Sequence, residues 1–432
     1  MIKFFFIFLS FFLITNCSFD TRSGIWTDDK DIDRENSKIT VLFEKEKIIN
    51  NEFNKDFIIQ TPLKKLKKKN QYSSNDYGFY ELKAKFTKQS KYKFSKINSF
   101  DNFDPDLTFD KDQLIFFDKT GSIIKFDNSS KILWKKNYYS KREKKNFPIL
   151  DFSVSKKYLV VTDSLSKYYV LDLFSGEQLW SKSHNTTFNS EIKIDGNKVY
   201  VIDANNILLC FSLVDGSKLW EFNSDKELIK SQKKLSVVYD DKKIFFNNSK
   251  GDIYALDKKN GNLLWITNIR DADENSQSFL MKTSKIVLND KKLFLSNNKN
   301  NIFSLDSNSG FINWKQNVNS DLKPIIVGNL ILSISLDGYF FLIDKNSGNI
   351  LRITDIFLNY SEKKRKKIIP TGFVVGVDEI YLSLNTGKIL VINLANGRPI
   401  YQFSLGRDKI SRPFVNDNFL YFVKNSEIVK LR

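Results

Sequence analysis

The sequence predicts an all-β protein: an eight-bladed β-propeller of four-stranded antiparallel blades. The stretch "GDIYALDKKNGNLLWITN" (251–268) is typical of two strands joined by a turn at Gly261, and near copies of it follow one another along the chain. The residues at the position of Trp265 recur at spacings of 46, 40, 45, 49, 38 and 49; they are Trp134, Trp180, Trp220, Trp265, Trp314, Arg352 and Tyr401. A period in the forties without a helical pattern indicates small sheets arranged in a ring. An open β-solenoid is the alternative, although its coils are usually shorter.

The blade count comes from eight hairpins. They are "DQLIFFDKTGSIIKF", "KYLVVTDSLSKYYVL", "NKVYVIDANNILLCF", "KKIFFNNSKGDIYAL", "KKLFLSNNKNNIFSL", "NLILSISLDGYFFLI", "DEIYLSLNTGKILVI" and "DNFLYFVKNSEIVKL". The eighth ends at Arg432 without room for an outermost strand, and an open sheet edge invites aggregation. Counting back from the first hairpin by the usual spacing reaches "KYKFSKI" (91–97), with Phe94 in the place of Trp. We expect this N-terminal strand to complete the last blade. The stretch "GFYELKAKF" (78–86) is the alternative donor.

The turn inside each repeat has a physical explanation. Asp257 can accept backbone N–H groups at the strand end, and Gly261 tolerates the positive φ that such a turn requires. The Trp four residues later lies on the outermost strand, where its apolar face can dock between neighbouring blades. Burial of so large a ring contributes about 2–3 kcal/mol. We therefore interpret Trp134, Trp180, Trp220, Trp265 and Trp314 as blade-docking residues; the alternative is a ligand-binding stack.

The N-terminus has the pattern of an export signal. Residues 1–16 contain one Lys and an apolar run from Phe4 to Ile14, which suits a signal peptide and is too short to span a bilayer as a helix. Cys17 then resembles the lipidated cysteine of a bacterial lipoprotein, although Asn16 stands where a small residue is usual, and an ordinary cleaved signal is the alternative. We expect residues 17–89 to form a largely irregular, lipidated tether, and residues 90–432 to form the propeller with its closing strand.

The chain is strongly basic, with 68 Lys and Arg against 50 Asp and Glu and a formal net charge of +18. Basic clusters lie at Lys64–Lys69, Lys141–Lys145 and Lys363–Lys367. They indicate either attraction to an anionic partner or charge spread over a solvated surface, and none of them matches a nucleic-acid-binding module. The two cysteines, Cys17 and Cys210, and the single His184 form no metal-binding pattern. We expect no metal, no cofactor and no catalytic residue.

The repeat "ALDKKNGNLLW" (255–265) resembles the quinoprotein-type (PQQ-like) propeller repeat, over about three-quarters of the chain. Two functional classes share that repeat. PQQ-dependent alcohol dehydrogenases have an adjacent pair of cysteines stacked on the cofactor and a Ca²⁺ held by acidic and amide ligands, whereas Cys210 is alone in this propeller. BamB-type lipoproteins have eight such blades, a lipidated N-terminal Cys and an N-terminal closing strand. The resemblance therefore favours the BamB type over an enzyme.

Resemblance to the BamB type implies a non-enzymatic scaffold. Such a protein is a subunit of the outer-membrane β-barrel assembly machinery, binds the periplasmic domains of the barrel-inserting subunit BamA, and assists folding and insertion of outer-membrane proteins. It is a monomer within a hetero-complex, lipid-anchored at the periplasmic face of the outer membrane. The family's partner contact lies near the junction of the third and fourth blades, here "SDKELIKSQKKL" (224–235) and "IRDADENSQSFLMK" (269–282). Leu228, Ile229 and Lys230 resemble that contact. The alternatives are ordinary solvated loops there, a quinoprotein enzyme, or a basic propeller that binds anionic polymer or lipid.

Overall fold

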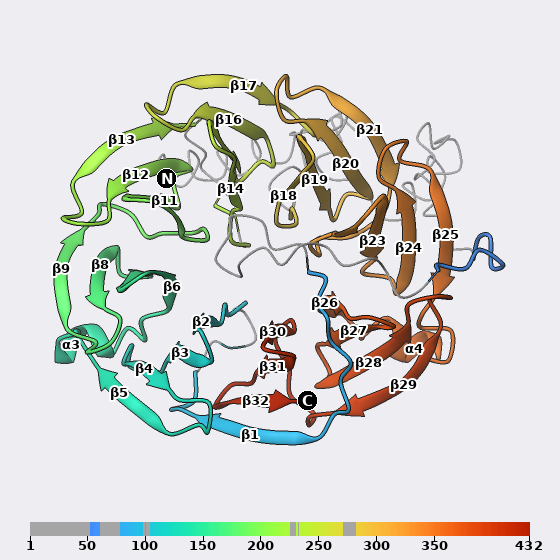
Figure 1. The fold of residues 1–432 in the computed structure, drawn as a ribbon, viewed down its shortest axis with the longest axis horizontal. Helices are drawn as coiled ribbons and strands as arrows, with labels where there is room; N and C mark the ends of the chain where they lie inside the picture. Colours follow the sequence, from blue (N-terminus) through green and yellow to red (C-terminus); the bar gives the residue numbers. More distant parts are fainter. Residues whose placement is uncertain are drawn as a thin grey trace, which may run out of the picture. The chain divides into compact units, whose positions relative to one another are not determined.

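The computed structural model describes residues 52–60, 78–97, 100, 104–224, 230–231, 233–270 and 282–432, all within the compact unit Ile49–Arg432. This part of the chain forms eight four-stranded antiparallel sheets, arranged as blades around a central axis (Figure 1). The predicted all-β, eight-bladed propeller is confirmed. α-Helix in the described part is limited to two short segments, α3 (Lys141–Lys144) and α4 (Glu362–Arg365). No described helix has the length and apolarity to cross a membrane.

The strands of each blade follow one another from the axis outward. Blades 1 to 4 are β2–β5 (Thr108–Asp110, Gln113–Phe117, Ile123–Phe126, Ile132–Lys136), β6–β9 (Leu150–Ser155, Tyr158–Asp163, Lys167–Asp172, Gln178–Ser183), β10–β13 (Lys193–Asp195, Lys198–Ile202, Ile207–Ser212, Lys218–Asn223) and β14–β17 (Val237–Tyr239, Lys243–Asn247, Ile253–Asp257, Leu263–Thr267). Blades 5 to 7 are β18–β21 (Val287–Asn289, Lys292–Asn297, Asn301–Asp306, Ile312–Asn317), β22–β25 (Ile325–Val327, Leu330–Ile334, Tyr339–Asp344, Ile350–Asp355) and β26–β29 (Pro370–Val375, Glu379–Leu384, Lys388–Asn393, Pro399–Ser404). Blade 8 combines β30–β32 (Phe414–Asn416, Phe419–Val423, Glu427–Leu431) with β1 (Lys88–Lys93).

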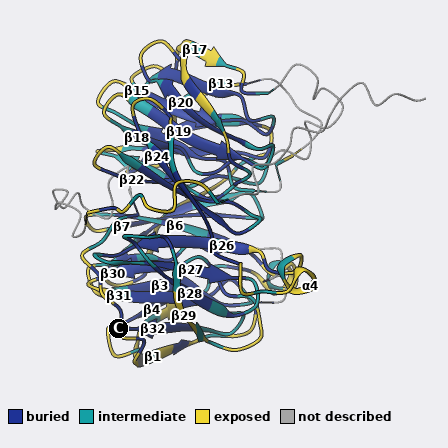
Figure 2. Ribbon diagram, turned by 90° about the vertical axis from the view of Figure 1, so that its right-hand side faces the viewer, coloured by how far each residue is buried: buried dark blue, intermediate teal, exposed yellow. Residues whose placement is uncertain are grey.

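The core lies between the blades. The two middle strands of each blade are covered on both faces by neighbouring blades, so they are nearly continuous apolar runs, such as "KIFFN" in β15 and "IYALD" in β16. The outermost strands are much more exposed, as β17 shows in Figure 2. In the turn between β16 and β17, Asp257 Oδ1 accepts the Lys259 N–H at 2.7 Å, and Gly261 has a φ of +77°. The expected roles of Asp257 as an acceptor of backbone N–H groups and of Gly261 as a residue with positive φ are therefore confirmed at this turn.

The last blade is closed by β1, which pairs antiparallel with β32 and aligns Tyr92 with Ile428. The strand begins three residues before the expected 91–97 stretch. Phe94 follows the end of β1 and packs on Phe116 with ring centroids 5.0 Å apart. Tyr92 also reaches blade 1, where its hydroxyl donates to the Asn128 carbonyl at 3.2 Å. Both side chains thus contact the next blade, and it is Tyr92 that donates a hydrogen bond to a turn carbonyl there, as the indole of Trp180 does in its own seam.

Residues 78–86, the alternative donor, run across blades 7 and 8 and supply no outermost strand. The Tyr80 N–H donates to Val375 of β26, and the Ala84 N–H donates to the Tyr381 hydroxyl at 2.8 Å. Leu82 and Phe86 are buried in the seam between these blades. This segment therefore leads the chain from the axis to the start of β1 (Figure 1).

A second N-terminal segment, residues 52–60, lies against blade 6, on the right of Figure 1. Phe53 and Ile353 of β25 exchange two backbone hydrogen bonds, at 3.0 and 3.1 Å. Arg352 stands at the Trp position of this blade and is only 2% exposed. Its guanidinium donates to the carbonyls of Lys55 and Phe57 at 2.7 and 2.5 Å. The missing Trp is thus replaced by an arginine that holds the N-terminal segment.

Candidate functional site

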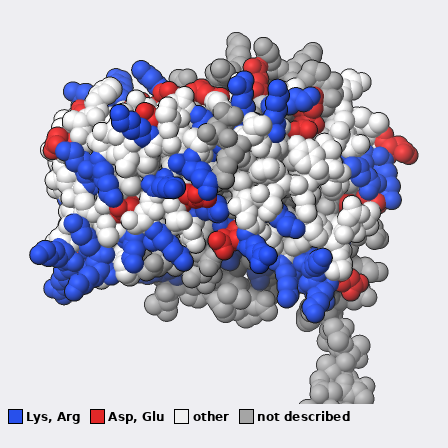
Figure 3. All heavy atoms as spheres, turned by 90° about the horizontal axis from the view of Figure 1, so that it is seen from below, with Lys and Arg blue, Asp and Glu red and all other residues white. Residues whose placement is uncertain are grey.

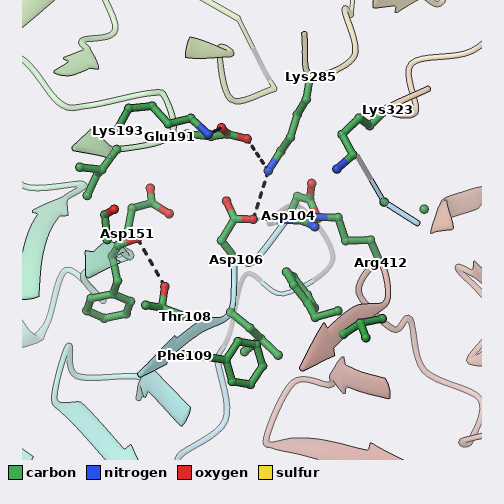
Figure 4. Close-up of a pocket in the computed structure, with 18 of the residues that line it drawn as sticks. Asp104, Asp106, Thr108, Phe109, Asp151, Glu191, Lys193, Lys285, Lys323 and Arg412 are labelled. Carbon is green, nitrogen blue, oxygen red and sulfur yellow. Dashed lines mark hydrogen bonds and ion pairs between the residues drawn. The ribbon is translucent and has the colours of Figure 1, made fainter. Parts of the chain in front are cut away.

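The innermost strands surround an axial cavity of about 570 Å³. Its walls carry apolar side chains such as Phe109, Phe152 and Phe414, and one end carries a group of charged residues (Figure 4). These charged residues precede or begin the innermost strands of most blades: Asp106, Asp151, Glu191, Lys193, Lys233, Lys234, Lys285, Asp321, Lys323 and Arg412. We call nine of these residues the axial ion cluster: Asp106, Asp151, Glu191, Lys193, Lys233, Lys234, Lys285, Asp321 and Arg412. Charged side chains from several blades therefore meet at one end of the axial cavity.

Asp106, which precedes β2, is the centre of the axial ion cluster (Figure 4). Its carboxylate contacts Lys285 at 3.2 Å and Lys234 at 3.5 Å, and it also pairs with Arg412. Burial by itself would raise the pKa of Asp106. The three cations outweigh burial and hold the pKa of Asp106 well below its usual range. Asp106 is therefore ionised at neutral pH and links blades 1, 4, 5 and 8.

The other acids of the cluster have cationic partners too. Glu191 contacts Lys285 at 2.6 Å and Lys193 at 2.7 Å. Burial opposes ionisation here as well, but Lys193 and Lys285 lower the pKa of Glu191 to about 2. Asp151 pairs with Lys234, yet burial and the nearby Asp106 charge raise its pKa. The cluster therefore pairs four acids with five cations, and these ion pairs link the innermost strands of different blades.

Three of these charged residues each follow a serine whose hydroxyl fixes the local backbone. In blade 3, the Ser190 hydroxyl accepts the Ile202 N–H at 2.7 Å and donates to the carbonyl of Glu191 at 2.9 Å. The same arrangement occurs with Ser284 beside Lys285 and with Ser411 beside Arg412. In all three cases the bonded N–H is twelve residues further along the chain. Sequence reasoning missed this signal, a Ser followed by a charged residue twelve positions before the end of the second strand.

The residues at the axis do not fit a quinone cofactor with its Ca²⁺ ion. Cys210, the one cysteine in the described residues, is buried in β12, and burial raises the pKa of its thiol to about 12. The acids of the axial ion cluster are engaged by Lys and Arg, so they are poor candidates for cation ligands. No group of three or more His, Cys, Asp or Glu in the described part of the chain could hold a metal ion. His184 lies outside the cavity, 3.0 Å from Asp203 and stacked on Phe188.

The connections from each outermost strand to the next innermost strand all emerge on one side of the ring, because the four strands of a blade alternate in direction. We call this side the connection face. The expected partner contact lies on it, in the connection from β13 to β14. Leu228 and Ile229 are outside the described residues, as are Cys17 and most of 269–282. Lys230 is exposed, and its neighbour Ser231 is held by Ser249 and Asn189 at 3.1 Å each.

The five tryptophans lie at the seams between successive blades. The ring of Trp134 packs on Gly176, Trp180 on Gly216, Trp220 on Gly261, Trp265 on Gly310 and Trp314 on Gly348. Each glycine belongs to the turn of the following blade, and none has room for a Cβ atom beside the indole. The Trp180 N–H also donates to the carbonyl of Leu213 in that blade, at 3.0 Å. The repeated Trp and Gly are therefore two halves of one contact.

Comparison with known proteins gives a consistent result. The family model described as "Outer membrane protein assembly factor BamB" matches residues 119–354, more than half of the chain. Among solved structures, BamB from Moraxella catarrhalis aligns with a TM-score of 0.67 at 15% identity, over 80% of this chain and 100% of its own.

Two other structures share the fold. The computationally designed Ika8 protein aligns with a TM-score of 0.60 at 12% identity, over 78% of this chain and 99% of its own. Quinohemoprotein alcohol dehydrogenase from Comamonas testosteroni aligns with a TM-score of 0.56 at 11% identity, over 80% and 76%. No curated protein matches the sequence. At these identities, likeness to the solved structures establishes the propeller alone.

Proposed function

The chain belongs to the family of the outer membrane protein assembly factor BamB, and we propose that it is a non-enzymatic scaffold of the machinery that inserts β-barrel proteins into the outer membrane. It binds the periplasmic domains of a BamA-type subunit and works beside the other subunits of that complex. An acylated Cys17 holds it at the periplasmic face of the outer membrane. The family match is the observation that carries this proposal.

The connection face supports the scaffold role. Ser231 and Lys233 fix the end of the connection from β13 to β14: Lys233 Nζ lies 3.4 Å from Asp321 of blade 6, and the Ser231 hydroxyl donates to the Lys233 carbonyl at 2.7 Å. Lys230 is thus presented from a braced position beside the axial ion cluster. A rigid base is what a docking loop needs, since less entropy is lost when a partner binds. We assign partner binding to Leu228, Ile229 and Lys230.

A quinoprotein enzyme is the competing function, since an alcohol dehydrogenase shares the propeller. Its chemistry would have to be performed at the axis, where the acids are already paired with Lys and Arg. Absorbance of a bound quinone and a Ca²⁺-dependent alcohol oxidation would favour the enzyme over the scaffold.

The test is affinity capture of the lipidated protein from detergent-solubilised membranes, with mass spectrometry of its partners and of the N-terminal peptide. We expect recovery of a BamA-type subunit and a diacylglyceryl group on Cys17. Lys230→Glu should reduce that recovery, whereas the matched Lys259→Glu, on an exposed turn of the opposite face, should not. A soluble, unlipidated protein without an assembly subunit would overturn the proposal.

A further inference from the structure

The scaffold role leaves two basic clusters unexplained, and both lie on the connection face. Residues 141–145 ("KREKK") include helix α3 (Lys141–Lys144) in the connection from β5 to β6. Residues 363–367 ("KKRKK") overlap helix α4 (Glu362–Arg365) in the connection from β25 to β26. Both connections leave an outermost strand and enter an innermost strand, so they share one face. Figure 1 places α3 and α4 at widely separated points of the ring.

In each cluster, one side chain forms an ion pair with another part of the propeller: Glu143 in α3 and Arg365 in α4. Glu143 closes the capping box with Ser140 and pairs with Lys167 at 2.5 Å. Arg365 turns inward, pairs with Asp355 at 2.7 Å and donates to the carbonyl of Asp337. The remaining eight cations form no ion pair with any described residue; they are Lys141, Arg142, Lys144, Lys145, Lys363, Lys364, Lys366 and Lys367. Each cluster therefore presents positive charge that is not neutralised by an ion pair within the part of the chain that the structure describes.

Exposed apolar side chains accompany both clusters. Phe147, just after α3, is 43% exposed, with Lys119 Nζ 5.0 Å from its ring centroid. Leu358 and Ile369 flank α4 and are 62% and 53% exposed. Basic residues that surround exposed aliphatic and aromatic side chains are typical of segments that rest in the interface of an anionic membrane.

On the opposite face, three tight turns carry one charge of each sign, with Lys111 beside Asp112, Asp241 beside Lys242, and Asp290 beside Lys291. The turn between β6 and β7 carries two lysines, Lys156 and Lys157, which is still a smaller group than either helix cluster. In edge view, Lys and Arg outnumber Asp and Glu, with dense groups at the lower left and lower right of Figure 3. In the connections that contain α3 and α4, residues 141–145 carry four Lys or Arg and residues 363–367 carry five.

We propose that the clusters at α3 and α4 form a two-point binding surface for the anionic headgroups of a phospholipid bilayer. A flat anionic surface can contact two separated rim clusters at once, and each apolar neighbour can enter the headgroup region. Binding would set the orientation of the propeller at the membrane, which a single lipid anchor on Cys17 does not. This role is additional to the scaffold role and needs no assembly subunit.

The experiment is co-sedimentation of the non-acylated chain from residue 18 onward with vesicles of phosphatidylcholine, with and without phosphatidylglycerol, at low and high NaCl. We expect binding only with phosphatidylglycerol, and loss of binding at high salt. Neutralising Lys363, Lys364, Lys366 and Lys367 to Gln should weaken the partition coefficient at least about tenfold, since each basic residue near an anionic surface contributes measurably. The corresponding four-residue variant at 141–145 should act similarly.

The control changes equal charge on the other face, with Lys156, Lys157, Lys242 and Lys259 replaced by Gln, all four being exposed. It should retain most of the binding, and circular dichroism should show the same fold for every variant. Equal losses in control and cluster variants would overturn the proposal, because net charge alone would then explain binding. Capture by polyglutamate but not by anionic vesicles would overturn it in favour of an acidic protein partner.

Discussion

The five seam tryptophans differ in the hydrogen bonding of the indole N–H, and this difference yields a matched pair of substitutions. The N–H of Trp314, in blade 5, donates to the Lys345 carbonyl of the following blade, blade 6, at 3.1 Å, and the ring is 9% exposed. The N–H of Trp134 is buried, but no described group accepts it. We predict that Trp314→Phe destabilises the propeller clearly more than Trp134→Phe.

The difference arises because a lysine takes the turn carbonyl that the indole N–H of Trp134 would otherwise bind. In the seam of Trp134, the equivalent acceptor is the carbonyl of Leu173, and it is taken by Lys125 Nζ at 3.0 Å. Lys125 is 2% exposed and comes from blade 1, the same blade as Trp134. In the seam of Trp314, the acceptor is open to the indole. The lysine in the middle strand therefore decides whether the neighbouring Trp can form its bond.

The expected magnitude follows from what each substitution leaves behind. Both changes remove the same part of the indole, so the loss of apolar contact largely cancels in the comparison. Trp314→Phe also leaves the Lys345 carbonyl without its donor, which costs about 1–3 kcal/mol for a buried group. Trp134→Phe removes a donor that was already unsatisfied. The difference between the two free energies of unfolding should therefore be about 1–3 kcal/mol, with Trp314→Phe the less stable.

Equilibrium urea unfolding, followed by far-UV circular dichroism, measures this difference from the two midpoints at a common slope. Trp134→Ala and Trp314→Ala serve as references that remove the ring in both seams. If the two Phe variants unfold at the same midpoint, or if Trp134→Phe is the less stable, the hydrogen bond does not distinguish the seams and the reasoning fails.

Three further predictions concern the turns, the axis and the closure. Gly216→Ala places a Cβ 2.5 Å from the Trp180 ring at a φ of +67°, so it should lower the unfolding midpoint much more than Gly196→Ala, whose Cβ meets nothing within 4 Å. Asp106→Asn should lower the free energy of unfolding by roughly 3 kcal/mol at neutral pH, because it leaves three partly buried cations without their carboxylate. The Asp106 pKa is depressed in the folded state, so its contribution is complete above the ordinary value of 3.8 and is lost as pH falls from there through the folded value; urea titrations should show the variant's deficit shrinking as pH falls below 3.8. Tyr92→Ala should cost about 3–5 kcal/mol and promote aggregation by loosening the closing strand, and light scattering together with thermal unfolding would show a milder change for Tyr92→Phe.

Much of the architecture was predictable because it repeats. A turn such as Asp257–Gly261 is encoded by adjacent residues, and each copy confirms the others, so the hairpins and the blade number could be read directly. The closing strand followed from arithmetic on the same period, which located it within three residues. The identity of its seam residue did not, because β1 enters from outside the repeat and its register is set by pairing with β32.

The axial ion cluster could not be predicted in the same way. Asp106 and Arg412 are 306 residues apart, and their contact depends on the ring closing around the axis. The charged residue at this position changes from blade to blade, with Asp106 and Asp151 in blades 1 and 2 but Glu191, Lys285 and Arg412 in blades 3, 5 and 8, so alignment of the copies does not mark a conserved group. Arg352 is a similar case: it replaced a Trp, and only the docking of residues 52–60 shows what it binds.

The contacts that the repeats do not predict involve the N-terminal part of the chain, and several of them close the ring. The five Trp–Gly contacts each join one blade to the next, and they would serve an open spiral equally well. Closure requires contacts that join the first part of the chain to the last, and three such contacts lie at different radii: Asp106 with Arg412 at the axis, Leu82 and Phe86 in the seam of blades 7 and 8, and β1 with β32 at the rim. Because all three depend on residues 78–106, that non-repeating segment determines whether the blades form a closed ring, and the Asp106 and Tyr92 variants test its two ends.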